Sequence, residues 1–190
     1  MTTITKTSYC ARLDAVLLGA TLLLSLSIQG QTLNVLHNFR HNELGYQPNG
    51  GLIVGPNGEI YGTTSNGGAL GLGLAYALLP PNSPGGAWKQ VVLHSFGKNG
   101  DGPVSAGLLL GPSGALYGVT SQSANGEGTV FRLTPPKGTN KPWREIILHA
   151  FTDSNADGEG PRAAPAFGPH GELYGSTSTG GTETSGVVLE

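Results

Sequence analysis

Short apolar stretches, each bounded by glycine or proline, divide the chain into segments of strand length. In the middle of the chain four of them follow one another, at residues 107–111, 115–121, 129–134 and 143–151. They are rich in β-branched and aromatic residues, and turns or loops containing Pro and Gly separate them, which is typical of antiparallel strands. After the N-terminal region no useful length of sequence has apolar residues at helical spacing. The pattern therefore predicts an all-β fold.

This arrangement recurs three times. The phrase Leu-His-x-Phe begins at Leu36, Leu93 and Leu148, which are 57 and 55 residues apart, and Tyr-Gly pairs and Gly-Pro-x-Gly turns repeat with nearly the same step. A period of about 56 residues with four strands per period is typical of a β-propeller blade. We therefore predict a β-propeller-like array of about three four-stranded units. The units cover about residues 40–96, 97–151 and 152–190.

The two ends of the array carry complementary pieces. Residues 32–39 resemble a fourth strand without its first three, whereas unit 152–190 has three strand candidates and no fourth. Propellers commonly close by such an exchange, which removes an exposed strand edge. We therefore expect strand 32–39 to complete the last unit. Closed rings usually have four or more blades, so two alternatives stay open: the chain is a fragment of a longer repeat protein, or a second copy completes the ring.

The N-terminal segment, residues 1–31, resembles a secretory signal peptide. Lys6 and Arg12 precede an apolar run at residues 15–28, and polar residues follow. The run is short for a membrane span, and a single N-terminal anchor helix is the alternative. We expect cleavage to leave a repeat domain at residues 32–190 with no membrane span, located in the periplasm or outside the cell as a secreted protein.

Composition and charge narrow the range of partners. The 32 glycines and 13 prolines fall between apolar runs, where they favour turns over disorder. The formal net charge is −2 and no basic block is present, which argues against a nucleic acid as partner. The single cysteine, Cys10, lies in the N-terminal segment, so the repeat domain has no disulfide to stabilise it.

The phrases "LHSF", "GLLLGPSGALYGVTS" and "GTVFRLTPP" carry a family resemblance. Repeated together over about residues 32–190, they resemble the GloVer tandem repeats of secreted bacterial proteins. The resemblance implies export, a β-propeller-like fold and often a C-terminal sorting or anchoring element, but no established enzymatic activity. The sequence departs from this pattern because no such element follows Glu190, which favours the fragment alternative.

Three histidines recur in the Leu-His-x-Phe phrase. On a regular strand His94 shares a face with Val92 and Phe96, so we expect a half-buried histidine that ties its strand to the next loop. The alternative is a metal site formed by His37, His94 and His149 together. A propeller would keep these residues apart, because it places this strand on the outside of each blade.

One loop resembles half of a calcium site. Asp153, Asn155 and Asp157 alternate ahead of a glycine, as oxygen ligands do in the first half of an EF-hand loop, and Glu159 follows. These four residues are the candidate calcium ligands. Ala164 stands where the bidentate glutamate is expected, and the other units keep little of the pattern, so an ordinary turn is the alternative.

The sequence shows no catalytic constellation and no other cofactor site. It lacks a Gly-x-Ser-x-Gly elbow, a phosphate-binding glycine loop and a pair of carboxylates placed to flank a glycosidic bond. We therefore expect a non-enzymatic binding or structural module at or outside the cell surface, with a protein or a polysaccharide as ligand. The alternatives are a carbohydrate-active lyase or hydrolase on a propeller scaffold, and a non-functional fragment of a longer repeat protein.

Overall fold

The computed structural model describes residues 33–190 except 124–125, 139–140 and 153–156. Residues 35–190 form one compact unit. The predicted signal peptide, residues 1–31, lies outside the described residues. In the part of the chain that is described, no helix has the length and apolar character needed to cross a membrane.

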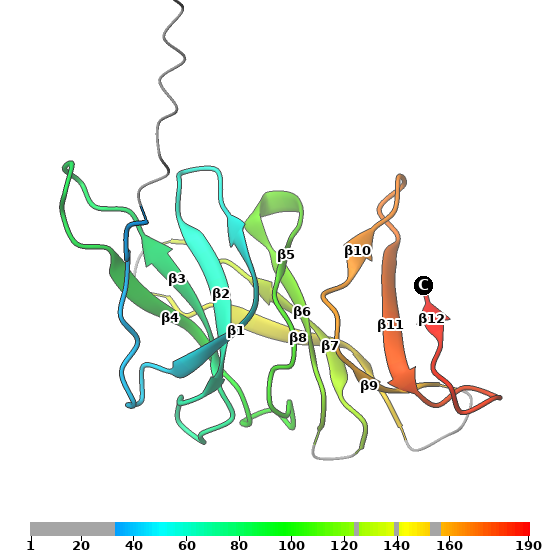
Figure 1. Ribbon diagram of the computed structural model, residues 1–190. Helices are drawn as coiled ribbons and strands as arrows, with labels where there is room; N and C mark the ends of the chain where they lie inside the picture. Colours follow the sequence, from blue (N-terminus) through cyan, green and yellow to red (C-terminus); the bar gives the residue numbers. More distant parts are fainter. Residues whose placement is uncertain (1–32, 124–125, 139–140, 153–156) are drawn as a thin grey trace, which may run out of the picture. The chain divides into compact units, whose positions relative to one another are not determined.

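Among the described residues, all regular structure except one short 3-10 turn (Pro112–Gly114) consists of antiparallel strands in three sheets (Figure 1). The first sheet contains, in spatial order, β1 (Tyr46–Val54), β2 (Ile60–Asn66), β3 (Leu74–Leu79) and β4 (Lys89–Ser95). The second sheet has the same order, with β5 (Leu109–Leu110), β6 (Leu116–Thr120), β7 (Thr129–Thr134) and β8 (Arg144–Ala150). The predicted all-β class is therefore confirmed.

The third sheet differs in its first strand. Two short strands, β9 (Glu159–Pro161) and β10 (Ala166–Phe167), both pair with β11 (Leu173–Thr179), which also pairs with β12 (Val188–Leu189). β9 and β10 together take the place of one interrupted strand. Within the described residues no strand pairs with the second edge of β12, so the third sheet fills three of the four strand positions of the repeat.

The Tyr-Gly pair of each unit has the same place in the sheet. Its glycine lies opposite a large apolar residue of the next strand, and the three pairs are Gly62 with Tyr76, Gly118 with Phe131 and Gly175 with Leu189. A Cβ atom on Gly118 would lie 2.5 Å from the Phe131 ring, and one on Gly62 would lie 2.5 Å from the Tyr76 hydroxyl oxygen. In the first two sheets this glycine is therefore needed because the opposing aromatic side chain crosses over it.

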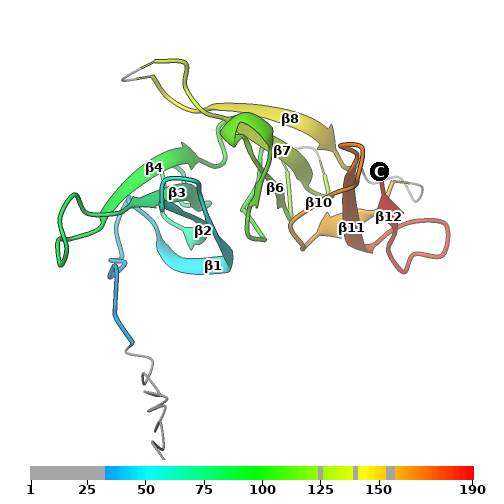
Figure 2. The ribbon, with the colours of Figure 1, turned by 90° about the horizontal axis from the view of Figure 1, so that it is seen from above.

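The apolar core between the first two sheets is built around two phenylalanines. Phe96, directly after β4, and Phe131 in β7 are fully buried, and their ring centroids are 5.1 Å apart. Leu93, Leu108 and Leu116 belong to the same buried cluster. Seen from above, β4 and β8 lie on the same side of their sheets (Figure 2). The two sheets therefore repeat in the same orientation, with an aromatic contact between them.

A second apolar cluster covers the other face of the first sheet. Leu74, Tyr76 and Leu78 of β3 form it, and Phe39 packs against them with its ring centroid 5.1 Å from that of Tyr76. Tyr76 and Phe131 are equivalent in register, so Phe39 stands to Tyr76 as Phe96 stands to Phe131. Residues 33–40 form no strand in this structure. Residues 33–39 therefore do not pair with the last unit here, and the closure by segment 32–39 stays a prediction.

A carboxylate holds the Gly-Pro-Asn-Gly turn before β2. Glu59 Oε2 accepts a hydrogen bond from the Asn57 N–H and Glu59 Oε1 accepts one from the Tyr61 hydroxyl, both at 3.0 Å. Burial, the hydrogen bond to Glu59 and the negative charge of Glu59 together raise the pKa of Tyr61 to about 12. The folded protein therefore keeps the Tyr61 proton at a pH where an unfolded tyrosine has lost it.

Tyr61→Phe is expected to make the protein less sensitive to alkaline pH. The folded pKa of Tyr61, about 12, exceeds the ordinary value of 10.0, so its contribution to stability is complete below pH 10 and is lost as the pH rises toward 12. At neutral pH the variant should be less stable by about 1 kcal/mol, because Glu59 loses one donor. Urea unfolding at a series of pH values measures both effects. Parallel stability profiles for the two proteins between pH 10 and pH 12 would contradict this account.

Candidate functional site

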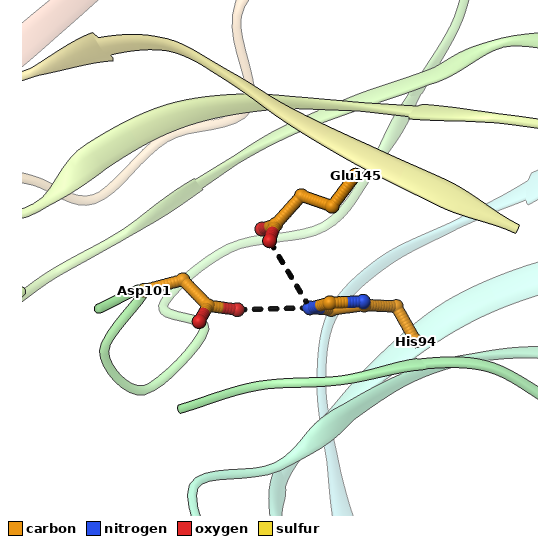
Figure 3. Close-up of side chains that lie close together, drawn as sticks. All are labelled: His94, Asp101 and Glu145. Atoms are coloured by element: carbon orange, nitrogen blue, oxygen red, sulfur yellow. Dashed lines mark hydrogen bonds and ion pairs between the residues drawn. The ribbon is translucent and has the colours of Figure 1, made fainter. Parts of the chain in front are cut away.

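A cluster of one histidine and two carboxylates lies between the first two sheets (Figure 3). It consists of His94, Asp101 and Glu145. In the described part of the chain this is the one group of three or more His, Cys, Asp or Glu side chains whose ligand atoms all lie within 4.8 Å of one another. Three separate segments supply these residues. His94 is near the end of β4, Asp101 is in the loop that leads to the second sheet, and Glu145 is in β8. The cluster therefore joins consecutive units.

A β-bulge in β4 orients the histidine. His94 pairs with Ala75 and Val92 pairs with the next residue of β3, so Leu93 is an extra residue on β4. The same irregularity occurs in β8, where Leu148 is the extra residue before His149. A bulge changes the direction in which side chains point. The prediction that His94 shares a strand face with Val92 assumes regular alternation, which does not hold at this bulge. Leu93 instead enters the core while His94 faces the next loop.

The three side chains of the cluster bind one another directly. His94 Nε2 donates to Asp101 Oδ2 at 2.8 Å and lies 3.5 Å from Glu145 Oε2. Asp101 Oδ1 accepts hydrogen bonds from the backbone N–H groups of Gly97 and Asn99, both at 3.0 Å. The Asn99 side-chain amide donates to Glu145 Oε2 at 2.8 Å. Asp101 is fully buried and only 2% of the Glu145 side chain is exposed, so almost every interaction of these carboxylates is internal.

The environment drives the pKa values of the two carboxyl groups apart. Burial acts to raise the pKa of Asp101, but the hydrogen bonds from His94 and from the amides of Asn99 and Gly97 outweigh it and leave this pKa lowered. Burial raises the pKa of Glu145, and the Asn99 hydrogen bond and the His94 charge offset this only in part, while Asp101 adds a like charge. Asp101 is therefore held as an anion, whereas the charge on Glu145 is disfavoured.

The junction between the second and third units repeats half of this arrangement. His149 Nε2 lies 3.0 and 3.1 Å from the two carboxylate oxygens of Asp157, and the Thr152 N–H donates to Asp157 Oδ2 at 3.4 Å. The pair is more open than its counterpart, because 46% of the His149 side chain and 26% of the Asp157 side chain are exposed. The predicted role of the repeated histidine, tying its strand to the next loop, is confirmed for His94 and His149.

Of the candidate calcium ligands, Asp153 and Asn155 lie outside the described residues. The Asp157 carboxylate faces His149, and Glu159 belongs to β9, where it pairs with Thr179. The structure therefore gives Asp157 a partner that the loop motif did not indicate. The calcium hypothesis stays a prediction.

The loop between the N-terminal segment and the first sheet shows which residues replace the two carboxylates of the cluster. Leu44 follows His37 by seven residues, as Asp101 follows His94. Gln90 and Glu145 are each the second residue of the fourth strand of their sheet. The Gln90 side-chain amide donates to the Leu44 carbonyl oxygen at 2.7 Å. A polar residue at this position therefore reaches back to the preceding loop in both units, whether or not it is charged. The sequence does not indicate Glu145 as a site residue, because the residue at this position differs from one repeat to the next.

A groove separates the second and third sheets. The two sheets are in contact through Tyr117 and Phe167, whose ring centroids are 5.1 Å apart, and through the Ser105 hydroxyl, which donates to the Pro161 carbonyl at 2.9 Å. Beside these contacts is a cavity of about 430 Å³. Its lining is mainly apolar and includes Val119, Val130, Leu148, Phe151, Leu173 and Leu189. His149 and Asp157 also face it, so the more open histidine–carboxylate pair lies at an accessible surface.

Comparison with known proteins points to one repeat family. A family model described as the Gloeobacter/Verrucomicrobia repeat matches residues 17–190. No curated protein matches the chain. The family match includes the residues of all three sheets.

Proposed function

Because this chain belongs to the Gloeobacter/Verrucomicrobia repeat family, we propose that it is an exported protein that acts as a binding or structural module. The observation that carries the proposal is the use of the recurring polar groups. His94 binds Asp101 and His149 binds Asp157, and each pair joins one unit to the next. The recurring histidine–aspartate pairs thus join the units of the array, and the groove between the second and third sheets is a surface that a partner can reach.

Export is tested by expressing the full chain in a Gram-negative host and determining the N-terminal sequence of the product. The charged start and the apolar run at residues 15–28 support removal of residues 1–31. We expect the mature protein in the periplasm or the medium, beginning near Gln31. An intact chain that begins at Met1 and stays in the cytoplasm would contradict export.

For the fold, we propose that the three sheets are propeller blades and that residues 35–39 complete the third one. The support is the Phe39 contact, since Phe39 already meets Tyr76 as the last strand of a preceding blade would. His94 pairs with Ala75 and His149 with Val130, and the equivalent of these partners in β12 is Val188. The proposed register therefore sets His37 opposite Val188. This pairing would cover the free edge and one wall of the groove.

Val188→Pro is expected to disrupt this closure. The Thr177 N–H donates to the Val187 carbonyl, so the backbone groups of the next residue, Val188, face the free edge. Proline there removes the N–H that a fourth strand needs, and we expect a loss of about 1–2 kcal/mol in stability. Val188→Ala is the control, because 81% of Val188 is exposed. Equal stability of the two variants would rule out a paired edge.

The mass of the protein in solution distinguishes the two sources of the closing strand. A monomer that is sensitive to Val188→Pro takes residues 35–39 from its own chain. A discrete dimer that dissociates in Val188→Pro takes them from a second copy. Heterogeneous association of the unmodified protein would favour the reading as a piece of a longer array.

A second candidate function, carbohydrate cleavage, is favoured by one observation. His149 and Asp157 lie together on the wall of the groove and are both partly exposed, and a histidine oriented by a carboxylate can act as a general base. The test is incubation with a panel of polysaccharides, followed by measurement of new reducing ends and of unsaturated products. Turnover that disappears in His149→Ala would establish an enzyme. Retention of a polysaccharide without turnover would support the binding module.

A further inference from the structure

The cluster of His94, Asp101 and Glu145 has the donor set of a metal site. One imidazole nitrogen and two carboxylate oxygens converge from β4, the following loop and β8 (Figure 3). Two ligands of one tetrahedral Zn²⁺ ion, each about 2.0–2.2 Å from the metal, are about 3.4 Å apart. The separation of His94 Nε2 and Glu145 Oε2 is 3.5 Å. The separation of His94 Nε2 and Asp101 Oδ2 is 2.8 Å, so these two atoms must move apart by about 0.6 Å to bind one ion.

An independent observation points to a missing partner in this cluster. Glu145 Oε1 is buried and has no hydrogen-bond partner among the described residues, and its side chain is 2% exposed. Buried polar atoms are almost always paired, and leaving a carboxylate oxygen unpaired is unfavourable. In the described part of the chain, neither Asp101 nor Glu145 forms a salt bridge with a lysine or arginine, and His94 is the basic group they share. Glu145 Oε1 is therefore a buried acceptor that no basic residue of the described chain pairs with.

We propose that His94, Asp101 and Glu145 bind a divalent transition-metal ion, with Zn²⁺ as the probe, and that this ion clamps the first sheet to the second. The imidazole nitrogen favours a borderline transition metal over calcium or magnesium, which take oxygen ligands. The three side chains supply three ligands, and water reaches the fourth position because the His94 side chain is partly exposed. This site is separate from the candidate calcium loop, and it depends neither on export nor on the binding role.

The chain contains a matched control for the proposed site. His149 and Asp157 repeat the His94–Asp101 pair, but among the described residues no third ligand stands with them. Asp157→Asn should therefore leave zinc binding unchanged. Glu145→Gln removes one anionic ligand while it keeps the shape of the side chain and an acceptor for Asn99. This variant is expected to fold, whereas variants of His94 or Asp101 also remove a buried hydrogen bond.

The experiment uses the full chain after removal of metal with a chelator. Calorimetric titration with Zn²⁺ should give one equivalent bound to the unmodified protein and to Asp157→Asn, and the melting temperature of both should rise as zinc is added. Glu145→Gln should bind zinc at least about tenfold more weakly, since even residues behind the ligands change affinity by that factor. Co²⁺ in place of Zn²⁺ should give a visible absorption band that Glu145→Gln loses.

Two results would overturn the proposal. One is an unmodified protein that shows neither zinc binding nor a change in melting temperature. The other is zinc binding of equal strength in the unmodified protein and in Glu145→Gln, which would locate the ion elsewhere on the chain.

Discussion

Replacing Phe131 by alanine is expected to lower the free energy of unfolding by about 3–5 kcal/mol. The ring is fully buried at the centre of the core between the first two sheets, it contacts Phe96, and it crosses over Gly118. Alanine removes the apolar contacts and leaves a cavity between two sheets that cannot close on it without moving apart. The variant should therefore weaken both the second sheet and its attachment to the first.

Urea unfolding with tryptophan fluorescence measures this change. Phe131→Leu keeps most of the side-chain volume and should lose much less, about 1 kcal/mol. Val54→Ala removes an exposed side chain and should change stability by less than about 0.5 kcal/mol. A loss in Phe131→Ala no larger than that in Phe131→Leu would show that the Phe96–Phe131 contact does not join the sheets.

Asp101→Ala is expected to destabilise the protein by about 3–5 kcal/mol when measured with chelator present. Removing a buried carboxylate leaves its hydrogen-bond donors without an acceptor, and each unpaired buried donor costs about 1–3 kcal/mol. Here His94 loses its partner, and the N–H groups of Gly97 and Asn99 lose their acceptor. Two backbone donors of the loop that enters the second sheet are then unpaired, and His94 keeps only its longer contact with Glu145.

Asp157→Ala is the matched variant, since Asp157 has the same place in the next junction. Its pair with His149 is partly exposed, and exposed ion pairs contribute about 0–1 kcal/mol. The ratio of the two losses therefore measures the effect of burial on one repeated contact. Losses of equal size would mean that burial of the Asp101 junction adds nothing.

The effect of Asp101 also has a defined pH dependence. Because its folded pKa is lowered from the ordinary value of 3.8, its contribution to stability is complete above that pH and is lost as the pH falls through the folded pKa. Glu145 acts in the opposite sense, since its raised pKa makes the folded state bind its proton more tightly than the unfolded state does. Chemical unfolding of Asp101→Ala and of the unmodified protein should therefore give stabilities that converge in acid.

The strands of the repeat could be predicted because their chemistry is local. The expected strand at residues 129–134 coincides with β7, and those at 115–121 and 143–151 contain β6 and β8. The expected strand at residues 107–111 is reduced to the two residues of β5. The interrupted first strand of the third sheet could not be read from the sequence, because hydrophobic patterning does not show which residues of an apolar run find a ladder partner.

The junction cluster could be predicted only in part. The repeated histidine and its link to the next loop follow from the period of the sequence. The aspartate that follows each histidine in the second and third units suggested calcium or a turn, and its contact with the histidine depends on a bulge that alternation does not reveal. Glu145 is 51 residues from His94 in the sequence, and its counterpart is Gln90, so neither spacing nor repetition indicates that the two residues meet.

The contact between Phe39 and Tyr76 has a consequence for how such genes change length. Each of the first two sheets is covered on one face by an aromatic ring from the segment that precedes it, as Phe39 covers β3 and Phe96 covers β7. A segment that contains both a sheet and its covering ring therefore begins at one Leu-His-x-Phe phrase and ends before the next. Its limits differ from those of a unit that is counted from the first strand of a sheet. A duplication with these limits inserts a unit together with its own cover, so the array can lengthen without a new interface having to evolve at either end.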